Sequence, residues 1–296
     1  MTAIVVIFGV QKGIENVSKV MMPLLILMSL GLAIYSLTLE GAMDGLVYYI
    51  KPNFEEFSLK TVVAAMGQLF YSMSLAMGIM ITYGSYMRKE DNVEKSVRNI
   101  EIFDTLVAFL AGMMIIPAVF AFSNGDMEKL KAGPTLMFVT LPQVFASLPG
   151  GNILGFVFFV LVLLAALTSA ISLMETIVAI VMEKFKMSRI PACIVVSIVS
   201  LLIALPSALG YGALGNVTVF GMQFLDFFDF ISNNIMMPVV ALITAILIGW
   251  VVKPKYVEEE VESSGKFKSK LLFNIMIKFV VPVCMVIIFA SIFMDI

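Results

Sequence analysis

The sequence contains no histidine, only two cysteines and few charged residues. Without histidine there can be no imidazole metal site, Ser/His/Asp triad or imidazole proton relay. Cys193 and Cys284 both lie in apolar runs, whereas a disulfide framework needs more cysteines in polar loops. A net charge of −2 gives no basic excess for nucleic acid. No nucleophile–base pair, phosphate-binding loop or zinc spacing occurs, so nothing in the sequence supports an enzyme.

What the sequence does contain is apolar. Hydrophobic residues make up 60% of the 296 and charged residues 14%, too few charges to cover a soluble domain of this size. The apolar runs reach the ~20 residues that cross a bilayer as helix. We therefore expect an all-α, multi-pass protein of the cell membrane. Its expected spans are residues 20–39, 60–87, 99–122, 151–182, 190–209, 227–252 and 271–294, after an apolar stub at 1–9.

Lysine and arginine predict the orientation. Fifteen of the 19 fall in one alternating set of loops or just inside the last helix, and only Lys51, Lys60, Lys129 and Lys131 fall in the other set. Basic loops stay cytoplasmic, so the C-terminus is expected to be extracytoplasmic. In the outer loop at 123–151, the Pro and Gly residues predict short helices folded back over the outer face; the alternative is a loose connection.

Residues 67–78 place two glycines, two serines, Gln68 and Tyr71 in the middle of an expected span. Small and hydroxylated residues allow the backbone to leave helical geometry, so that two half-helices meet and direct carbonyls and amides at a ligand. The alternative is a continuous helix whose small residues allow close packing. Gln68 favours the break, because a buried amide in hydrocarbon needs partners.

Other polar residues in apolar surroundings have two interpretations each. Asp104, about one turn into 99–122, could reach the headgroups or hold a cation. Asp226 and Asp229 at the mouth of 227–252 fit a gate or ordinary helix capping.

In the middle of 151–182, Thr168 and Ser169 could bond back to the helix or ligate a hard cation. Glu175, two turns later, suggests a lined aqueous path.

Several motifs, in order along the chain, resemble those of the neurotransmitter:sodium symporter family, in particular its bacterial amino-acid transporters. They are Gly9-Val10-Gln11-Lys12-Gly13-Ile14-Glu15, residues 67–78 with Ile81-Thr82-Tyr83, Asp104-Thr105-Leu106-Val107 leading to Gly112 and Pro117, and residues 165–172. The resemblance runs over essentially the whole chain. It implies the second half of a LeuT-type five-plus-five inverted repeat plus one extra helix.

The resemblance also implies how the chain is organised. Residues 1–9 would end a truncated spanning helix, 10–252 would form the transporter domain, and 253–296 a cytoplasmic loop and final span. Within the transporter domain, 20–39 closes the first repeat and 60–252 holds the five helices of the second. The first three and a half helices of the family are then missing. This implies a truncated reading frame, a fragment or a split gene with its N-terminal half on another chain, and a chain inactive alone.

Carried over position by position, the resemblance assigns substrate-binding roles to Tyr71, Ser72, Ser74, Met77, Ser169 and Leu173. One sodium site takes Ser72 and Asp104, and a second takes the Ala165 carbonyl with the hydroxyls of Thr168 and Ser169. Each site is incomplete, because the family's first helix supplies the remaining ligands. Asp229 falls at the outer gate, and Glu183, near Tyr86, at the inner one.

The implied function is sodium-coupled symport of an amino acid, with Met77 and Tyr71 favouring a hydrophobic or aromatic substrate. Animal members bind chloride through a serine one turn after the Asp104 position; this chain has Ala108 there, so chloride is not expected to be required. Two other functions stay open: a sodium-independent or proton-coupled permease of the same fold, and an inactive membrane scaffold.

Overall fold

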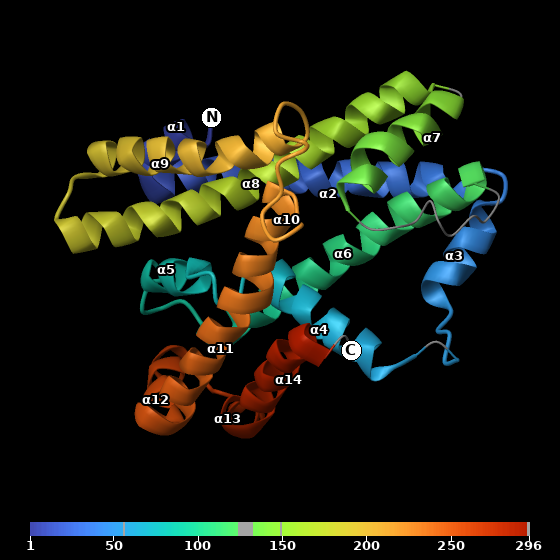
Figure 1. The fold of residues 1–296 in the computed structure, drawn as a ribbon. Coiled ribbons are helices and arrows are strands. Elements are labelled where there is room, and N and C mark those ends of the chain that lie inside the picture. The colour runs from blue at the N-terminus through green and yellow to red at the C-terminus, as the bar shows by residue number, and fades with distance from the viewer. Residues whose placement is uncertain (56, 124–132, 149, 295–296) are drawn as a thin grey trace. The chain divides into compact units, whose positions relative to one another are not determined.

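The computed structural model describes residues 1–55, 57–123, 133–148 and 150–294. Their regular structure is helical apart from one isolated bridge between Val219 and Met222, which confirms the expected all-α class (Figure 1). The chain forms two compact units that alternate along the sequence. Unit 1 comprises Met1–Glu56 and Ile102–Ser172, and unit 2 comprises Phe57–Glu101 and Leu173–Ile296. Two long helices, α6 (Val93–Ser123) and α8 (Gly151–Phe185), contribute to both.

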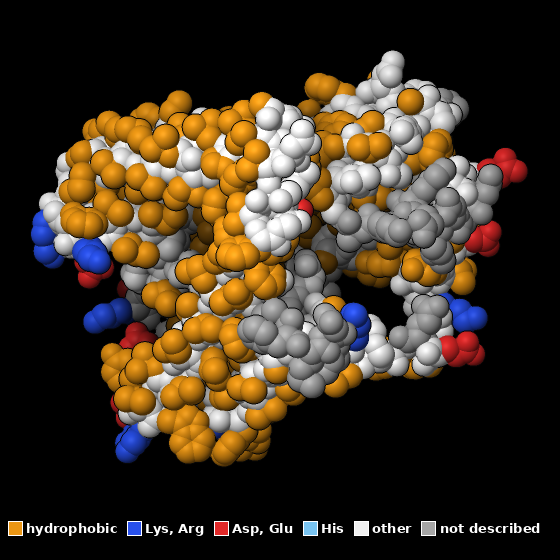
Figure 2. All heavy atoms as spheres, in the orientation of Figure 1, with side chains coloured by type: hydrophobic (Ala, Val, Ile, Leu, Met, Phe, Trp, Pro, Cys, Tyr) orange, Lys and Arg blue, Asp and Glu red, His pale blue; other side chains and the backbone are white. Residues whose placement is uncertain are grey.

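Six helical stretches of the described chain are long and apolar enough to cross a membrane. They are Lys12–Leu37, Val93–Ser123, Gly151–Phe185, Arg189–Gly210, Phe224–Val251 and Lys270–Ser291. Apolar side chains cover much of the face seen in Figure 2. Within the spans, Phe156 is 70% exposed and Leu201 67%. Six of the seven expected spans are thus confirmed as continuous helices. The seventh, at 60–87, is divided into α4 (Leu59–Ser72) and α5 (Ile79–Ser85).

Unit 1 is built around one apolar core. Besides its parts of α6 and α8, it contains α1 (Thr2–Ile7), the π-helix η1 (Val10–Glu15), α2 (Asn16–Leu37), α3 (Ala42–Ile50), the π-helix η3 (Leu136–Thr140) and α7 (Leu141–Ser147). Side chains from α2, α6, α7 and α8 form the core, with the rings of Phe145 and Phe158 5.3 Å apart. Short helices are confirmed for the described part of 123–151; residues 124–132 and 149 lie outside it.

Close backbone approach fixes α3 against α6. A Cβ on Gly45 would lie 2.9 Å from the Cα of Pro117 and 2.8 Å from the Cβ of Phe120, so only glycine fits there. Further along α3, Tyr49 stacks on Phe109 at 5.6 Å and donates from Oη to the Phe109 carbonyl at 3.4 Å. The helix α3 is therefore packed on α6 through Gly45 and Tyr49.

Unit 2 contains α9 (Arg189–Gly210) and two composite spans. The first runs through α10 (Phe224–Asp229), the π-helix η4 (Phe230–Met236), α11 (Met237–Ile246) and the π-helix η5 (Leu247–Val251). The second runs through α13 (Lys270–Ile275), the π-helix η6 (Met276–Val280) and α14 (Val281–Met294). These spans pack on each other, and α12 (Pro254–Ser264) joins them.

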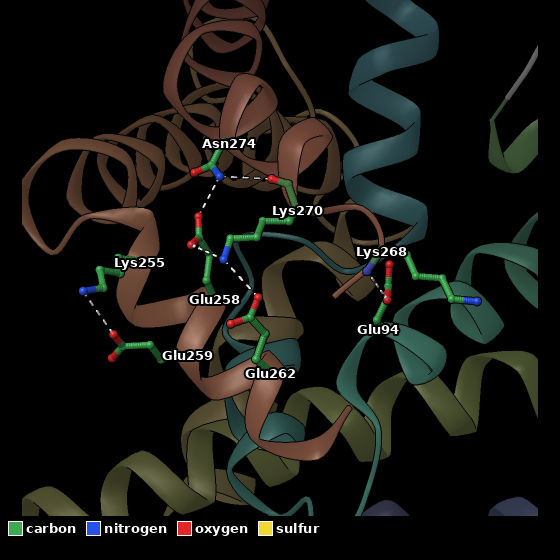
Figure 3. Close-up of polar contacts among 8 residues, drawn as sticks. All are labelled: Glu94, Lys255, Glu258, Glu259, Glu262, Lys268, Lys270 and Asn274. Carbon is green, nitrogen blue, oxygen red and sulfur yellow. Dashed lines mark hydrogen bonds and ion pairs between the residues drawn. The ribbon is translucent and has the colours of Figure 1, made fainter. Parts of the chain in front are cut away.

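Polar contacts hold α12 and the loop after it (Figure 3). The Lys270 ammonium lies 3.0 Å from carboxylate oxygens of both Glu258 and Glu262. The Asn274 amide donates to Glu258 at 2.6 Å. At the start of α6, the Glu94 carboxylate accepts from the backbone amides of Lys268 and Ser269, at 3.0 and 2.8 Å. These bonds tie the connection between the last two spans to α6.

Candidate functional site

The helix predicted to break does so at Ser72. Beyond α4, Ser74 has a φ of +54°, and the amide of Leu75 bonds to the Phe70 carbonyl while that of Ser74 bonds to the Tyr71 carbonyl. This pair of bonds is a Schellman motif, which terminates a helix and usually has glycine at the left-handed position. Ala76 (φ +60°) and Gly78 (φ +78°) then redirect the chain into α5. The continuous-helix alternative is wrong.

The break frees backbone groups from helical hydrogen bonding. Among the described residues, the carbonyls of 73–77 accept no backbone hydrogen bond and the amides of 76–81 donate none. Carbonyl oxygens at a helix C-terminus carry partial negative charge and attract cations, and amides at an N-terminus attract anions. Gly78 keeps the break close to α8, because a Cβ there would lie 3.1 Å from Cγ2 of the buried Thr176. Ser74 and Met77, two predicted substrate residues, lie inside this turn.

A cavity of about 600 Å³ opens along α4 within unit 2. Gln68 and Tyr71 line it from α4, and Asp229 and Asn233 line it from the opposite span. The Asn233 amide donates to Asp229 at 2.6 Å, so this carboxylate is oriented within the cavity wall. The structure thus brings a predicted substrate residue, Tyr71, to the same cavity as the predicted outer gate, Asp229.

The predicted second sodium site lies on α8 in unit 1. The Thr168 hydroxyl donates to the Ala165 carbonyl at 2.9 Å, and the Thr168 carbonyl accepts from Ser172 at 3.1 Å. Two of the three predicted ligands are therefore adjacent, and both keep lone pairs for a cation. Ser169, the third predicted ligand, follows Thr168 in the helix and its side chain is exposed. The hydrogen bond from Thr168 to the Ala165 carbonyl is also what the back-bonding alternative predicts. The geometry therefore agrees with both interpretations.

Asp104 lies deeper in its helix than expected. Because α6 begins at Val93 rather than at residue 99, Asp104 is its twelfth residue and is half-buried. At ~1.5 Å per residue it lies about 16 Å from the helix start, so the prediction of one turn was wrong.

The predicted partners Ser72 and Asp104 belong to different units, as do Tyr71 and Ser169. Leu173 begins the unit 2 part of α8. These pairings stay predictions.

A polar cluster that the sequence only hinted at joins α5, α8 and α9 within unit 2. Glu175 is fully buried and receives two hydrogen bonds from Arg189, at 2.7 and 2.9 Å. The Tyr86 hydroxyl donates to the same carboxylate at 2.7 Å. The predicted aqueous path at Glu175 is therefore replaced by a closed ion pair. Tyr86 contacts Glu175, not Glu183, which lies exposed two turns further along α8.

Comparison with known proteins places this arrangement in a family. The model of the sodium:neurotransmitter symporter family matches residues 1–296. An uncharacterized sodium-dependent transporter of Haemophilus influenzae is 39% identical over 96% of this chain and 61% of its own length. One of Bacillus subtilis is 36% identical over 98% of this chain and 64% of its own length. The chain thus spans about three-fifths of the length of these curated relatives.

A solved structure is similar over nearly the whole chain. The crystal structure of MhsT in complex with L-phenylalanine has a TM-score of 0.85 and 39% sequence identity, covering 98% of this chain and 65% of MhsT. The family model over residues 1–296 and these relatives point to the same family. The chain belongs to the sodium:neurotransmitter symporter family.

Proposed function

We propose that this chain takes part in sodium-coupled symport of an amino acid across the cell membrane. The observation that carries the proposal is the break between α4 and α5, where carbonyls and amides beside the serines have no backbone hydrogen bond among the described residues. A zwitterionic substrate needs both kinds of group, and half-helix ends of this type bind substrates and coupling ions in transporters. MhsT, which binds L-phenylalanine, supports an amino-acid substrate.

In this proposal, substrate contacts Tyr71, Ser72, Ser74 and Met77 along the break and Ser169 and Leu173 on α8. Sodium binds at Ser72 with Asp104, and at the Ala165 carbonyl with the hydroxyls of Thr168 and Ser169. Hydroxyl, carbonyl and carboxylate oxygens are the ligands that a hard cation prefers. Coupling follows because each ligand stabilises the conformation that the other prefers.

The gates and the orientation complete the proposal. Asp229, at the cavity beside Tyr71, closes the outer side. Tyr86 and Glu183 belong to the inner side, and the C-terminus is extracytoplasmic. Because Asp104 supplies a negative charge of its own, transport does not require chloride.

The first test is thermal unfolding of the purified chain in NaCl and in KCl of equal ionic strength, with and without L-phenylalanine. We expect sodium to raise the midpoint and L-phenylalanine to raise it further only in sodium. Thr168→Val removes one proposed ligand at nearly constant shape and should weaken the sodium effect, leaving only the part that comes from the site at Ser72 and Asp104. Ser197→Ala is the matched control, since its hydroxyl also donates to a helix carbonyl, that of Cys193 at 2.7 Å. Equal midpoints in both salts would reject sodium binding by this chain.

Uptake into proteoliposomes separates the competing functions. Accumulation driven by a pH gradient and indifferent to sodium would identify a proton-coupled permease instead. In a transporter that spans the full length of the curated relatives, accumulation is expected to persist when chloride is exchanged for gluconate; its loss would remove the assigned role of Asp104. An absence of both uptake and ligand-dependent stabilisation would favour a membrane scaffold.

A further inference from the structure

A second cavity, of about 570 Å³, lies within unit 2 where η5 leads into α12 and faces η6. It is separate from the cavity beside Tyr71 and shares no lining residue with it. Its charged lining consists of Lys253, Lys255, Lys278 and Glu258. None of these residues has a role in the proposed symport.

The wall of this cavity is fixed by a close helix crossing. A Cβ on Gly249 would lie 3.1 Å from the Ile277 carbonyl, so the two spans approach closely at this level. Pro282, four residues after Lys278, has no N–H to donate to the Lys278 carbonyl in the α-helical pattern. The indole Nε1 of Trp250 donates to that carbonyl at 3.3 Å instead, and the Trp250 ring meets Phe279 edge-on at 5.9 Å.

The charges lining the cavity are only partly balanced. Glu258 is occupied by Lys270 at 3.0 Å and by Asn274 at 2.6 Å (Figure 3). Lys255 is paired only with exposed Glu259, at 3.6 Å, and both side chains remain more than half exposed. Within the described part of the chain, no ion pair is formed by Lys253 or Lys278. The cavity therefore has an excess of positive charge.

The cavity lies near the ends of two candidate spans, where lipid headgroups are expected. Lys278 is eight residues into the span Lys270–Ser291, or about 12 Å of helix, and its side chain is half-buried. Lys253 follows the end of the span Phe224–Val251. Beside them, Trp250 and Phe279 present apolar surface, 57% and 56% exposed. A tryptophan with snorkelling lysines marks the boundary between hydrocarbon and water, and a lysine inside a span indicates a functional partner.

We propose that this cavity is a phosphate-binding site, filled by the headgroup phosphate of an anionic phospholipid. The ammonium groups of Lys253 and Lys278 donate to the phosphate oxygens, and Lys255 can leave Glu259 to add a third donor. The acyl chains lie along the exposed faces of Trp250 and Phe279. A free inorganic phosphate shares the headgroup chemistry but has no apolar part that could contact this surface.

The chain contains a single tryptophan, Trp250, and it lines the cavity. Its fluorescence therefore reports on this site alone. We would reconstitute the chain in phosphatidylcholine bilayers and titrate in phosphatidylglycerol with brominated acyl chains, which quench a nearby indole. Brominated phosphatidylcholine in the same titration measures general lipid contact. We expect phosphatidylglycerol to quench Trp250 at a lower mole fraction than phosphatidylcholine.

Charge-neutral variants test the lysines. Lys253→Gln with Lys278→Gln should weaken the preference for phosphatidylglycerol about 30-fold, because each lysine near an anionic surface contributes about fivefold. Lys278→Arg should retain it. The matched control is Lys184→Gln with Lys186→Gln, two exposed lysines of the same unit outside the cavity, which should leave it unchanged. Circular dichroism checks that each variant keeps its helix content.

A free-phosphate arm distinguishes the source of the phosphate. Inorganic phosphate at millimolar concentration should not reverse the quenching by phosphatidylglycerol. Reversal that depends on Lys253 and Lys278 would keep the phosphate site but overturn its assignment to a lipid. No preference for phosphatidylglycerol, or equal losses in the cavity variant and the control, would overturn the site itself.

Discussion

Replacing Arg189 by methionine should destabilise unit 2 more than any other change in its polar cluster. The Glu175 side chain is inaccessible to solvent and receives three hydrogen bonds of 2.7 to 2.9 Å, two of them from Arg189. Arg189→Met leaves a buried carboxylate with Tyr86 as its only remaining partner in the cluster. Breaking one side of a buried ion pair costs about 3–5 kcal/mol.

Two further variants measure the interaction between Arg189 and Glu175. Glu175→Gln keeps the shape and the Tyr86 contact, and the remaining Arg189 charge is 24% exposed, so the cost should be smaller, about 1–3 kcal/mol. The double variant with Arg189→Met removes the buried charge altogether. It should therefore be more stable than Arg189→Met alone, a coupling that only a direct interaction produces.

The assay is unfolding of the chain in detergent micelles by added dodecyl sulfate, followed by the fluorescence of Trp250, which belongs to the same unit. Glu259→Gln, which breaks the exposed pair with Lys255, is the control and should change the free energy of unfolding by less than about 1 kcal/mol. If Arg189→Met costs no more than this control, or if the double variant is the least stable of the three, the buried pair of Arg189 and Glu175 does not stabilise unit 2.

Three other predictions concern packing, helix termination and pH. Gly45→Ala should cost about 1–3 kcal/mol through overpacking against Pro117 and Phe120, whereas Gly31→Ala, with open space at its Cβ, should be neutral or stabilising; thermal midpoints compare them. Ser74→Gly should stabilise by up to about 1 kcal/mol and Ser74→Val should destabilise, because the backbone there is left-handed; unchanged midpoints in both would contradict the break. Hydrogen bonds from Asn274 and then Lys270 lower the pKa of Glu258 below 4.5, so its stabilising effect is complete above pH 4.5 and is lost as the pH falls through the folded value. An acid titration of Trp250 fluorescence should show this loss in the wild type and at higher pH in Asn274→Ala.

Most of the helical framework could be predicted from the sequence because each span is an apolar run with its own length requirement. The break at Ser72 could be predicted for a different reason: glycines, serines and Gln68 are unfavourable in a continuous lipid-facing helix. The exact start of α6 could not be predicted, because its first turns, from Val93, are polar and show no periodic pattern of apolar residues. That error displaced Asp104 by two turns.

The partners of the buried charges could not be predicted from local pattern. Tyr86 and Glu175 are 89 residues apart, and Arg189 opens a different helix, so hydropathy predicts neither their meeting nor the choice of Glu175 over Glu183. Glu175 was recognisable as a carboxylate among apolar residues, which was the available signal. The hydrogen bond from the Trp250 indole to the Lys278 carbonyl could not be predicted either. Pro282 indicates that this carbonyl lacks its α-helical donor, but it does not indicate which group donates instead.

The length of α8 also limits which membranes suit this chain. Its 35 residues extend about 52 Å, whereas a ~30 Å hydrocarbon layer crossed at the largest common tilt, about 40°, takes up only ~39 Å of helix. At least about nine residues must therefore lie outside the hydrocarbon, and more at smaller tilts. A bilayer several ångströms thicker can be accommodated by drawing some of these residues inward, at little cost because tilt and protrusion compensate each other. We expect α8 to accommodate lipids of longer acyl chain, whereas the 22-residue spans Arg189–Gly210 and Lys270–Ser291 limit the thickness that the fold tolerates; reconstitution across a chain-length series can test this.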